Sequence, residues 1–395
     1  MKKIFAAALI AALLLGSTVP AAAESDTKAA LLMDYETGQI LYAHNIDQVL
    51  PPASITKLMT LHLVFEAIAE GRISLTDEVK VSAHASDLPK GSSVIFLGIG
   101  EVLTVKELLT AVAIISANDA GIALAEHVAG SESAFVKMMN EKARELGMTG
   151  TTFLNSHGLH AEGHNMSARD IAILSRATIE KYPEILNYSS QKFTRMKRDP
   201  RYVKEGYFDL TSTFRSLIGW RNIDGLKTGW TPEAGRCITV TAAEGERRYI
   251  AVVMGAKNEQ ERDQKVKELL ALGFDQYQPL VAVKADEVLQ RIAIARAKNQ
   301  EVPVAAAKDL ILIVKKGSSA EDFQETVTIK PGLTAPLAKG DIVGTLSYRK
   351  DGEEISAVDL VLTEDVAEAG FFTLALRYLS QVFTDLGKWI MGLFS

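Results

Sequence analysis

The sequence predicts an α+β protein in which a sheet covered by helices is followed by a small all-β domain and a C-terminal amphipathic helix. Up to about Gln278, strand patterns occur at both ends of the segment and long helical patterns lie between them. After that point the pattern changes to short alternating runs separated by turns rich in glycine and charge, which is typical of an antiparallel β domain. Residues 371–394 then repeat apolar side chains at steps of three and four.

The N-terminus is typical of a secretory signal peptide. Lys2 and Lys3 precede an unbroken apolar run, residues 4–15, and small residues follow as far as Ala23. A membrane-spanning anchor is the alternative, but it needs about 20 apolar residues, and this run has only twelve. We expect export and removal of residues 1–23. Loss of the two lysines lowers the formal net charge from −6 to −8, which argues against nucleic acid as a partner.

Length and cysteine content limit the number of domains and of disulfide bonds. The remaining chain of about 370 residues exceeds the usual single-core domain of about 100–200, so at least two domains are expected. We divide it into residues 24–278, residues 279–367 and a separate helix, 368–395. Cys237 is the only cysteine, so the chain can form no intrachain disulfide and has no cysteine near the cleavage site to carry a lipid.

Local patterns within residues 24–278 predict two hairpins and a run of helices. Apolar runs at 29–34 and 39–43 flank turn residues and predict the first hairpin. Residues 237–243 and 249–254 predict the second, which a charged helix at about 259–272 follows. Three of the four helices predicted between the hairpins end just before a glycine; the four span residues 55–70, 105–115, 120–129 and 133–146.

The last two segments differ from the first in pattern. In residues 279–367 the alternating runs are 310–314, 326–329, 342–348 and 355–362. In residues 368–395 the apolar positions form one helical face, while polar residues such as Arg377 and Lys388 recur too often for a membrane span. We expect this helix to lie in a membrane interface. An ordinary core or oligomer helix is the alternative.

A Ser-x-x-Lys element at the start of an apolar helix is the first candidate for chemistry. Ser54 and Lys57 are three residues apart, so on a helix their side chains share a face and can meet. The spacing alone is not specific, because it also occurs at Ser25, Ser189 and Ser347. Only Ser54 precedes a helix with a buried pattern, which should draw its lysine into a packed interior; the other three are predicted to be solvated turns.

Two further elements give this serine a context. Ser116-Ala117-Asn118 lies between two helical patterns, and Lys227-Thr228-Gly229 precedes the second hairpin. The order S-x-x-K, S-x-N, K-T-G is the set found in penicillin-binding proteins and class A β-lactamases. With further matches across residues 28–275, such as His157-Gly158-Leu159, the chain resembles the low-molecular-mass penicillin-binding proteins that act as D-alanyl-D-alanine carboxypeptidases.

The resemblance implies a fold, a reaction and a set of roles. The fold is a serine β-lactamase/transpeptidase-like domain, a mainly antiparallel sheet flanked by helices, followed by a β-sandwich. The reaction removes the terminal D-alanine from peptidoglycan stem peptides at the outer face of the cytoplasmic membrane. Penicillins and other β-lactams would bind at the same site, and neither a cofactor nor a metal is implied.

The implied roles meet physical requirements. Ser54 would attack the substrate carbonyl while Lys57 accepts its proton. A free lysine costs roughly 4–5 kcal/mol to deprotonate at neutral pH, so the pKa of Lys57 must be lowered by burial and by Lys227. The resemblance assigns proton relay to Ser116, orientation to Asn118, the substrate carboxylate to Lys227 and Thr228, close approach to Gly229, and the oxyanion hole to the backbone N–H groups of Ser54 and Trp230.

Other interpretations of the sequence are less well supported. His157, His160 and His164 suggest zinc, but their spacing matches no H-E-x-x-H helix, and the nearby glycines indicate a loop. A β-lactamase of class A would need a glutamate where Thr151 precedes Leu154-Asn155. A non-catalytic penicillin sensor or wall-binding module is the other alternative, although such a binder would not need the full set of reactive residues.

Overall fold

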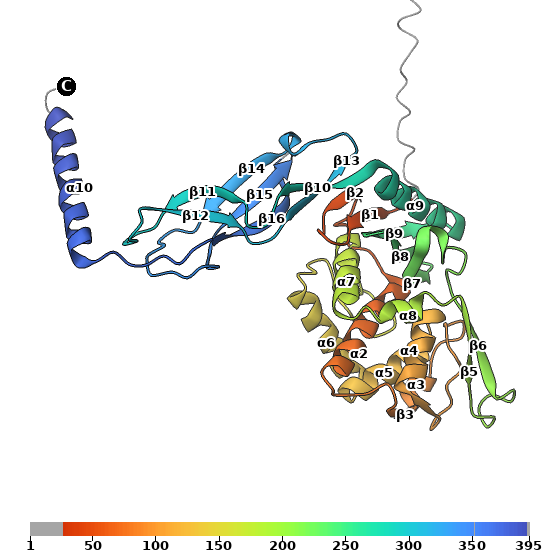
Figure 1. Ribbon diagram of the computed structural model, residues 1–395. Coiled ribbons are helices and arrows are strands. Elements are labelled where there is room, and N and C mark those ends of the chain that lie inside the picture. The colour runs from red at the N-terminus through yellow and green to blue at the C-terminus, as the bar shows by residue number, and fades with distance from the viewer. Residues whose placement is uncertain (1–26, 351, 393–395) are drawn as a thin grey trace, which may run out of the picture. The chain divides into compact units, whose positions relative to one another are not determined.

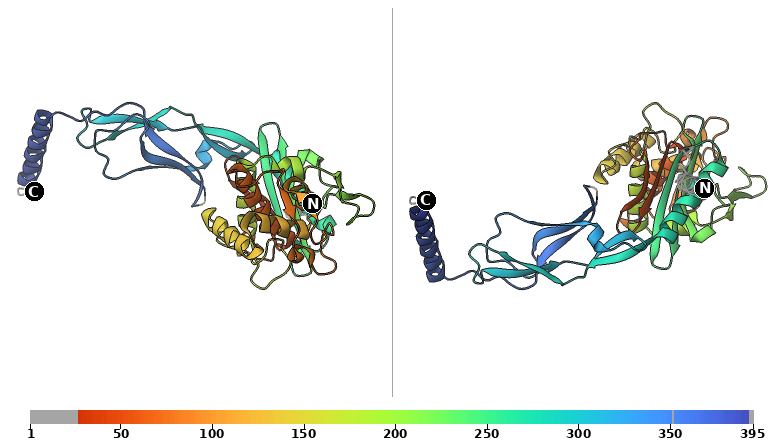
Figure 2. Two further views of the ribbon diagram at one scale, coloured as in Figure 1. Left: turned by 90° about the horizontal axis from the view of Figure 1, so that it is seen from below. Right: turned by 90° about the horizontal axis from the view of Figure 1, so that it is seen from above.

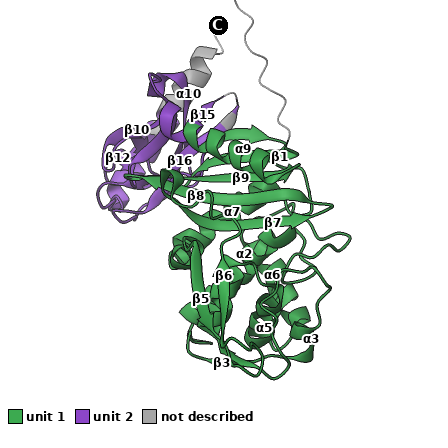
Figure 3. Ribbon diagram, turned by 90° about the vertical axis from the view of Figure 1, so that its right-hand side faces the viewer, with its two compact units in different colours: residues 1–35, 40–271 green, residues 36–39, 272–395 purple. Residues whose placement is uncertain are grey.

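The computed structural model describes residues 27–350 and 352–392, which form two compact units. Unit 1 comprises most of the chain up to Ala271, and unit 2 comprises residues 272–395 together with the turn 36–39 (Figures 1 and 3). The predicted signal peptide, residues 1–23, lies outside the described residues. Each unit has its own apolar core, so each is described separately.

Unit 1 is built on a five-stranded antiparallel sheet with the strand order β2-β1-β9-β8-β7. The sheet joins the two ends of the unit's sequence, because β1 pairs along its whole length with β9. Strand β7 is at one edge and therefore has one row of backbone groups without a strand partner. The strands are β1 (Ala29–Asp34), β2 (Ile40–His44), β7 (Ile223–Thr231), β8 (Gly235–Glu244) and β9 (Arg247–Ala256).

Helices cover both faces of this sheet. All six residues of β1 and the central six of β8 and of β9 are buried, which requires cover on each side because side chains alternate between faces. Figure 2 shows α9 (Glu259–Ala271) on one face and the other helices of the unit on the opposite face. These helices are α2 (Lys57–Ala69), α3 (Ala83–Ser86), α4 (Val105–Ile114), α5 (Asn118–Ala129), α6 (Glu132–Glu145), α7 (Ala168–Lys181) and α8 (Ile185–Ser189).

Local sequence signals explain where several of these helices begin. Thr104 and Glu107 form a reciprocal capping box at the start of α4, and Ser131 and Ser167 cap α6 and α7 through their hydroxyls.

Short elements complete the unit: the 3₁₀ turns η1 (Ala53–Thr56) and η2 (Trp220–Asn222), the pair β3 (Glu78–Lys80) and β4 (Val102–Thr104), and the hairpin β5 (Phe193–Lys197) and β6 (Tyr207–Thr211).

The α+β prediction is confirmed, and both predicted hairpins and the predicted helices are present with small shifts in their ends. Helix α7 was not predicted, although Ser167 and Asp170 provide the signal of a capped first turn. The edge strand β7 was also missed, because its lysine, threonines and glycines do not follow an alternating apolar pattern.

Unit 2 contains an antiparallel five-stranded sheet, a two-stranded sheet and a C-terminal helix. The larger sheet has the order β11-β12-β16-β15-β14, and β10 pairs with β13. The core of the unit is mostly aliphatic and includes Val304, Leu312, Val343 and Leu360, each fully buried. The strands are β10 (Tyr277–Val283), β11 (Val288–Ala293), β12 (Glu301–Ala306), β13 (Leu310–Lys315), β14 (Gln324–Ile329), β15 (Ile342–Lys350) and β16 (Glu353–Leu362).

The chain's C-terminal helix is α10 (Phe371–Gly392), and most of its large apolar side chains that the structure describes, up to Phe383, are exposed. Arg377 donates from its guanidinium to the carbonyl groups of Ala297 and Lys298, at 2.7 and 2.8 Å, and so ties the first half of α10 to the β domain. Among the described residues no helix is both long and apolar enough to cross a membrane.

Candidate active site

Ser54 and Lys57 meet at the junction of η1 and α2. The Lys57 Nζ atom lies 2.8 Å from the Ser54 Oγ atom and donates to the carbonyl of His157 at 2.6 Å. The lysine side chain is fully buried, whereas Ser54 is half-buried and lines a cavity. Burial, and then the positive charge of Lys227, lower the pKa of Lys57 well below its ordinary value. Lys57 therefore lies within reach of the serine proton, in surroundings that disfavour its charged form.

The other Ser-x-x-Lys runs differ from this one at the lysine. Ser189 and Ser347 are buried, in contrast to the solvated turns that the sequence predicted. Their lysines, Lys192 and Lys350, are exposed to solvent. Serine burial therefore does not distinguish Ser54, but lysine burial does. The remaining run, at Ser25, begins outside the described residues.

Two residues near the nucleophile adopt unusual backbone conformations. Ala53 has φ of 49° and Ser116 has φ of 65°, in the left-handed region that residues with a Cβ seldom occupy. Gly158, with φ of 85°, lies against the carbonyl of Ala53 so closely that an added Cβ would clash with it. Strained backbone of this kind clusters at functional sites, where the surrounding structure must hold it in place.

The Ser116-Ala117-Asn118 element connects α4 to α5 and lines the cavity. The Ser116 hydroxyl and the side-chain amide oxygen of Asn118 are buried, and neither has a hydrogen-bond partner in the described part of the chain. The backbone N–H of Asn118 donates to the Ser93 carbonyl at 2.7 Å, which fixes the neighbouring cavity wall. Buried polar groups without partners cost free energy, so these two atoms are poised to bind a ligand.

The K-T-G element lies on β7, the edge strand. Gly229 is required by close packing, because a Cβ there would lie 2.6 Å from the Pro52 carbonyl and 3.0 Å from the Ser54 nitrogen. The Thr228 hydroxyl contacts that of Thr213 at 2.6 Å. Lys227 is buried, and this burial lowers its pKa to about 7. Strand β7 thus packs against η1 beside the nucleophile.

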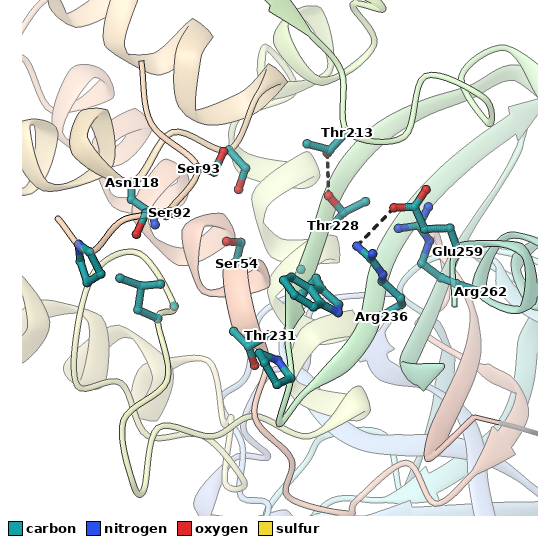
Figure 4. Close-up of a pocket in the computed structure, with 18 of the residues that line it drawn as sticks. Ser54, Ser92, Ser93, Asn118, Thr213, Thr228, Thr231, Arg236, Glu259 and Arg262 are labelled. Atoms are coloured by element: carbon teal, nitrogen blue, oxygen red, sulfur yellow. Dashed lines mark hydrogen bonds and ion pairs between the residues drawn. The ribbon is translucent and has the colours of Figure 1, made fainter. Parts of the chain in front are cut away.

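A cavity of about 450 Å³ unites these elements. Six of the predicted site residues line it, namely Ser54, Ser116, Asn118, Thr228, Gly229 and Trp230, while Lys57 and Lys227 are buried behind its wall. In Figure 4, Ser54 lies between Ser92, Ser93 and Asn118 on one side and Thr213, Thr228, Arg236, Glu259 and Arg262 on the other. The structure therefore brings the three sequence elements into one site.

Several residues of the site were not predicted from the sequence. Arg262 and Glu259 reach the cavity from α9, and Arg236 from β8. Arg262 is only 3% exposed, and its guanidinium is paired with the carboxylate of the neighbouring Asp263 at 2.7 and 2.8 Å. The only sequence signal was the charged face of α9, and exposed helices commonly have such a face.

Glu132 supports the backbone group that contacts Lys57. It lies at the first position of α6 and accepts hydrogen bonds from the Ser156 backbone N–H and hydroxyl at 2.9 and 2.6 Å. Its other oxygen lies 2.8 Å from a ring nitrogen of His84. These contacts fix the segment that leads into His157, whose carbonyl accepts from Lys57.

The histidines considered as zinc ligands make separate protein contacts. His157 accepts from the Leu159 backbone N–H, and His164 lies 2.8 Å from the Thr56 hydroxyl and accepts from Leu154. Burial lowers the pKa of both imidazoles to about 4, which keeps them neutral. In the described ranges no cluster of three or more metal-binding side chains occurs.

Thr151, at the position where a class A β-lactamase has its glutamate, donates to Asp170 at 2.7 Å. Among the cavity-lining residues of the described chain the only carboxylate is Glu259, and it is paired with Arg236 at 3.2 Å. No free carboxylate is therefore available within the described cavity to activate water beside Ser54.

Comparison with known proteins agrees with the geometry. Residues 17–258 match the D-alanyl-D-alanine carboxypeptidase family, and residues 277–368 match the C-terminal domain of penicillin-binding protein 5. The chain is 38% identical over 391 residues to D-alanyl-D-alanine carboxypeptidase DacF of Bacillus subtilis, over 95% of this chain and 98% of that protein.

Solved structures give the same result. Penicillin binding protein 5 from Haemophilus influenzae is similar with a TM-score of 0.76 and 31% identity, over 89% of this chain and all of that one. Penicillin-binding protein D2 from Listeria monocytogenes, in its ampicillin-bound form, has a TM-score of 0.56 and 32% identity, over 64% of this chain and 98% of that one. The comparisons favour a carboxypeptidase over a β-lactamase or a non-catalytic binder, and the chain belongs to the serine D-alanyl-D-alanine carboxypeptidase family of low-molecular-mass penicillin-binding proteins.

Proposed function

We propose that Ser54 is the nucleophile in removal of the terminal D-alanine from peptidoglycan stem peptides. The observation that carries the proposal is the 2.8 Å contact between Ser54 Oγ and the Nζ atom of the fully buried Lys57. The residues expected to bind and orient substrate surround the same cavity. Incubation with a D-Ala-D-Ala pentapeptide tests the proposal: D-alanine is released, with a transient ester on Ser54.

The proposed reaction proceeds in two steps. Lys57 accepts the Ser54 proton as Oγ bonds to the carbonyl carbon of the penultimate D-alanine, and the negative charge on oxygen faces the backbone N–H groups of Ser54 and Trp230. The C–N bond then breaks, and the departing D-alanine amine receives the proton through Ser116. Water hydrolyses the ester and restores the serine. Asn118 orients the peptide amide through its unpartnered oxygen and its amide nitrogen.

Positive charge at one end of the cavity supports the proposed specificity for a chain terminus. Lys227 and Thr228 are adjacent on β7 and can bind the substrate's terminal carboxylate, while the Arg262 guanidinium, which lines the same cavity, is paired with Asp263. β-Lactams have a carboxylate at a similar distance from a strained amide. We propose that they acylate Ser54 in the same cavity, as the ampicillin-bound form of the Listeria relative suggests.

The pH profile of kcat/KM is expected to depend on the substrate's C-terminus. Activity rises with pH as Lys57 loses its proton, because the neutral amine is the base. It falls as the free enzyme passes through about pH 7, where Lys227 loses the charge that attracts the carboxylate. A peptide with a C-terminal amide should react more slowly and lack this fall. Steady-state rates between pH 5 and 10 provide the measurement; the same fall near pH 7 with both substrates contradicts the role of Lys227.

We further propose that the protein is exported, that residues 1–23 are its signal peptide, and that residues 368–395 attach it to the outer face of the cytoplasmic membrane. In α10, Phe371, Phe372, Tyr378 and Phe383 are each at least 70% exposed. This helix is not long and apolar enough to cross a membrane. Its exposed aromatic side chains suit the interfacial region of a bilayer. The catalytic and β domains are proposed as residues 24–278 and 279–367.

Truncation before Gly370 is expected to release a soluble protein that retains its activity. Flotation with phospholipid vesicles checks this result, and point variants refine it. Leu379→Asp places a charge among the exposed apolar side chains and should weaken binding about tenfold or more, whereas Thr373→Asp, a change of similar charge at an exposed polar position, should have a smaller effect. Equal binding by the truncated and full-length proteins refutes the assignment.

A further inference from the structure

The cavity has a distinct end for the residue that leaves. In the proposed mechanism, on which this inference rests, the terminal carboxylate lies beside Lys227 and Thr228. The departing residue must therefore occupy the same side of Ser54 as Thr228. Figure 4 shows that Arg236, Glu259 and Arg262 also lie on this side, away from Ser92 and Asn118.

Trp230 belongs to the same end of the cavity. It is two residues after Thr228 on β7, so the two side chains share one face of the strand. Trp230 pairs directly with Arg236 of β8 in the sheet register. The Arg236 guanidinium lies 4.8 Å from the centroid of the indole ring, which is a cation–π contact. All three side chains line the cavity.

An ion pair holds this stacked pair in position. Arg236 contacts Glu259 at 3.2 Å, and Glu259 is the first residue of α9. Arg262 lies one turn later on the same helix and is almost completely buried. The indole is nevertheless 54% exposed, so a large part of a bulky, supported apolar surface remains free at the cavity. Free surface of this kind can contact a ligand and can also limit its size.

We propose that Trp230, supported by Arg236 and Glu259, forms the wall of the leaving-residue subsite and restricts that residue to a small D-amino acid. D-Alanine contributes only a methyl group toward this wall. A C-terminal D-residue with a long or branched side chain would meet the indole while its carboxylate is held by Lys227 and Thr228. The wall thus makes the enzyme release a small terminal residue and reject larger leaving groups.

The test compares two peptides that differ only in the leaving residue, diacetyl-L-Lys-D-Ala-D-Ala and diacetyl-L-Lys-D-Ala-D-Leu. The readout is the ratio of their kcat/KM values, because both share the nucleophile, the oxyanion hole and the acyl part. Trp230→Ala is expected to reduce the preference for D-alanine at least about tenfold, since a few methylene groups at a fitted wall govern discrimination of this size. Arg236→Ala, which removes the support of the indole, should reduce it less.

Trp220 provides a matched control. It also lies near cations, with Arg221 and Lys267 each 5.9 Å from its ring, but it does not line the cavity. Trp220→Ala should leave the ratio unchanged. Trp230→His retains a ring and is the second variant if Trp230→Ala does not fold; it should reduce the preference to an intermediate extent.

The outcomes separate this inference from the proposed function. A ratio unchanged in a Trp230 variant that penicillin still acylates on Ser54 overturns the wall and leaves the nucleophile assignment intact. Failure of the wild-type protein to release D-alanine or to be acylated on Ser54 refutes the proposed function itself. Equal reductions in Trp230→Ala and Trp220→Ala also overturn the wall, because the effect would not be local to the cavity.

Discussion

Ser54→Ala is expected to abolish both release of D-alanine and covalent labelling by penicillin. The hydroxyl is the group that forms the ester in the proposed reaction, and no other residue of the described cavity pairs a hydroxyl with a buried lysine at 2.8 Å. Removal of the nucleophile of such a unit costs on the order of a million-fold in rate in a well-studied serine peptidase. Mass spectrometry after incubation with penicillin should show a single adduct on the wild-type protein and no adduct on the variant.

Ser347→Ala is the matched control for this variant. Ser347 also begins a Ser-x-x-Lys run and is also buried, but it lies on β15 in unit 2 and its lysine is exposed. It should leave labelling and peptidase activity unchanged. Retention of the penicillin adduct in Ser54→Ala contradicts the assignment of the nucleophile.

Lys57→Met is expected to lower the acylation rate by at least about 1000-fold while the protein stays folded. Methionine has a similar length but cannot accept a proton. Lys57 is fully buried, and methionine adds no charge at this position, so the core should remain packed. Stopped-flow acylation by penicillin measures the rate, and a thermal unfolding midpoint within a few degrees of the wild type demonstrates the fold.

Lys192→Met tests whether the spacing alone matters. Lys192 is three residues after Ser189 and is exposed to solvent. Its replacement should change neither acylation nor peptidase activity. If Lys57→Met is acylated by penicillin at the wild-type rate, a base other than Lys57 must accept the proton. The proposed mechanism supplies no such base and would be wrong.

The sequence predicted the parts of the fold that depend on local periodicity. Strands β8 and β9 and helices α4 to α6 have apolar repeats that local physics determines, and the structure contains them. Strand β7 could not be found in this way. It buries Lys227 and needs Gly229 for close approach to Ser54, so its residues were selected by the site rather than by a strand pattern.

The chemistry was predictable only where reactive residues form short motifs. Ser54 and Lys57 are close in sequence, and so are Ser116 and Asn118. Resemblance to a known family then connected these motifs and supplied their roles. Arg262 and Glu259 come from α9 and Arg236 comes from β8, and their approach depends on the packing of α9 against β8 and β9. Arginine and glutamate side chains are usually solvated, so no sequence pattern distinguished these three residues.

Mass spectrometry of the intact protein with a D-Ala-D-Ala pentapeptide and, separately, with penicillin tests the central claim most directly. The proposed mechanism predicts turnover of the peptide and a long-lived penicillin adduct on Ser54, because the tethered leaving group stays in the cavity and no free carboxylate lines its described part to activate water. Rapid multiple-turnover hydrolysis of penicillin, with no release of D-alanine from the peptide, would contradict it.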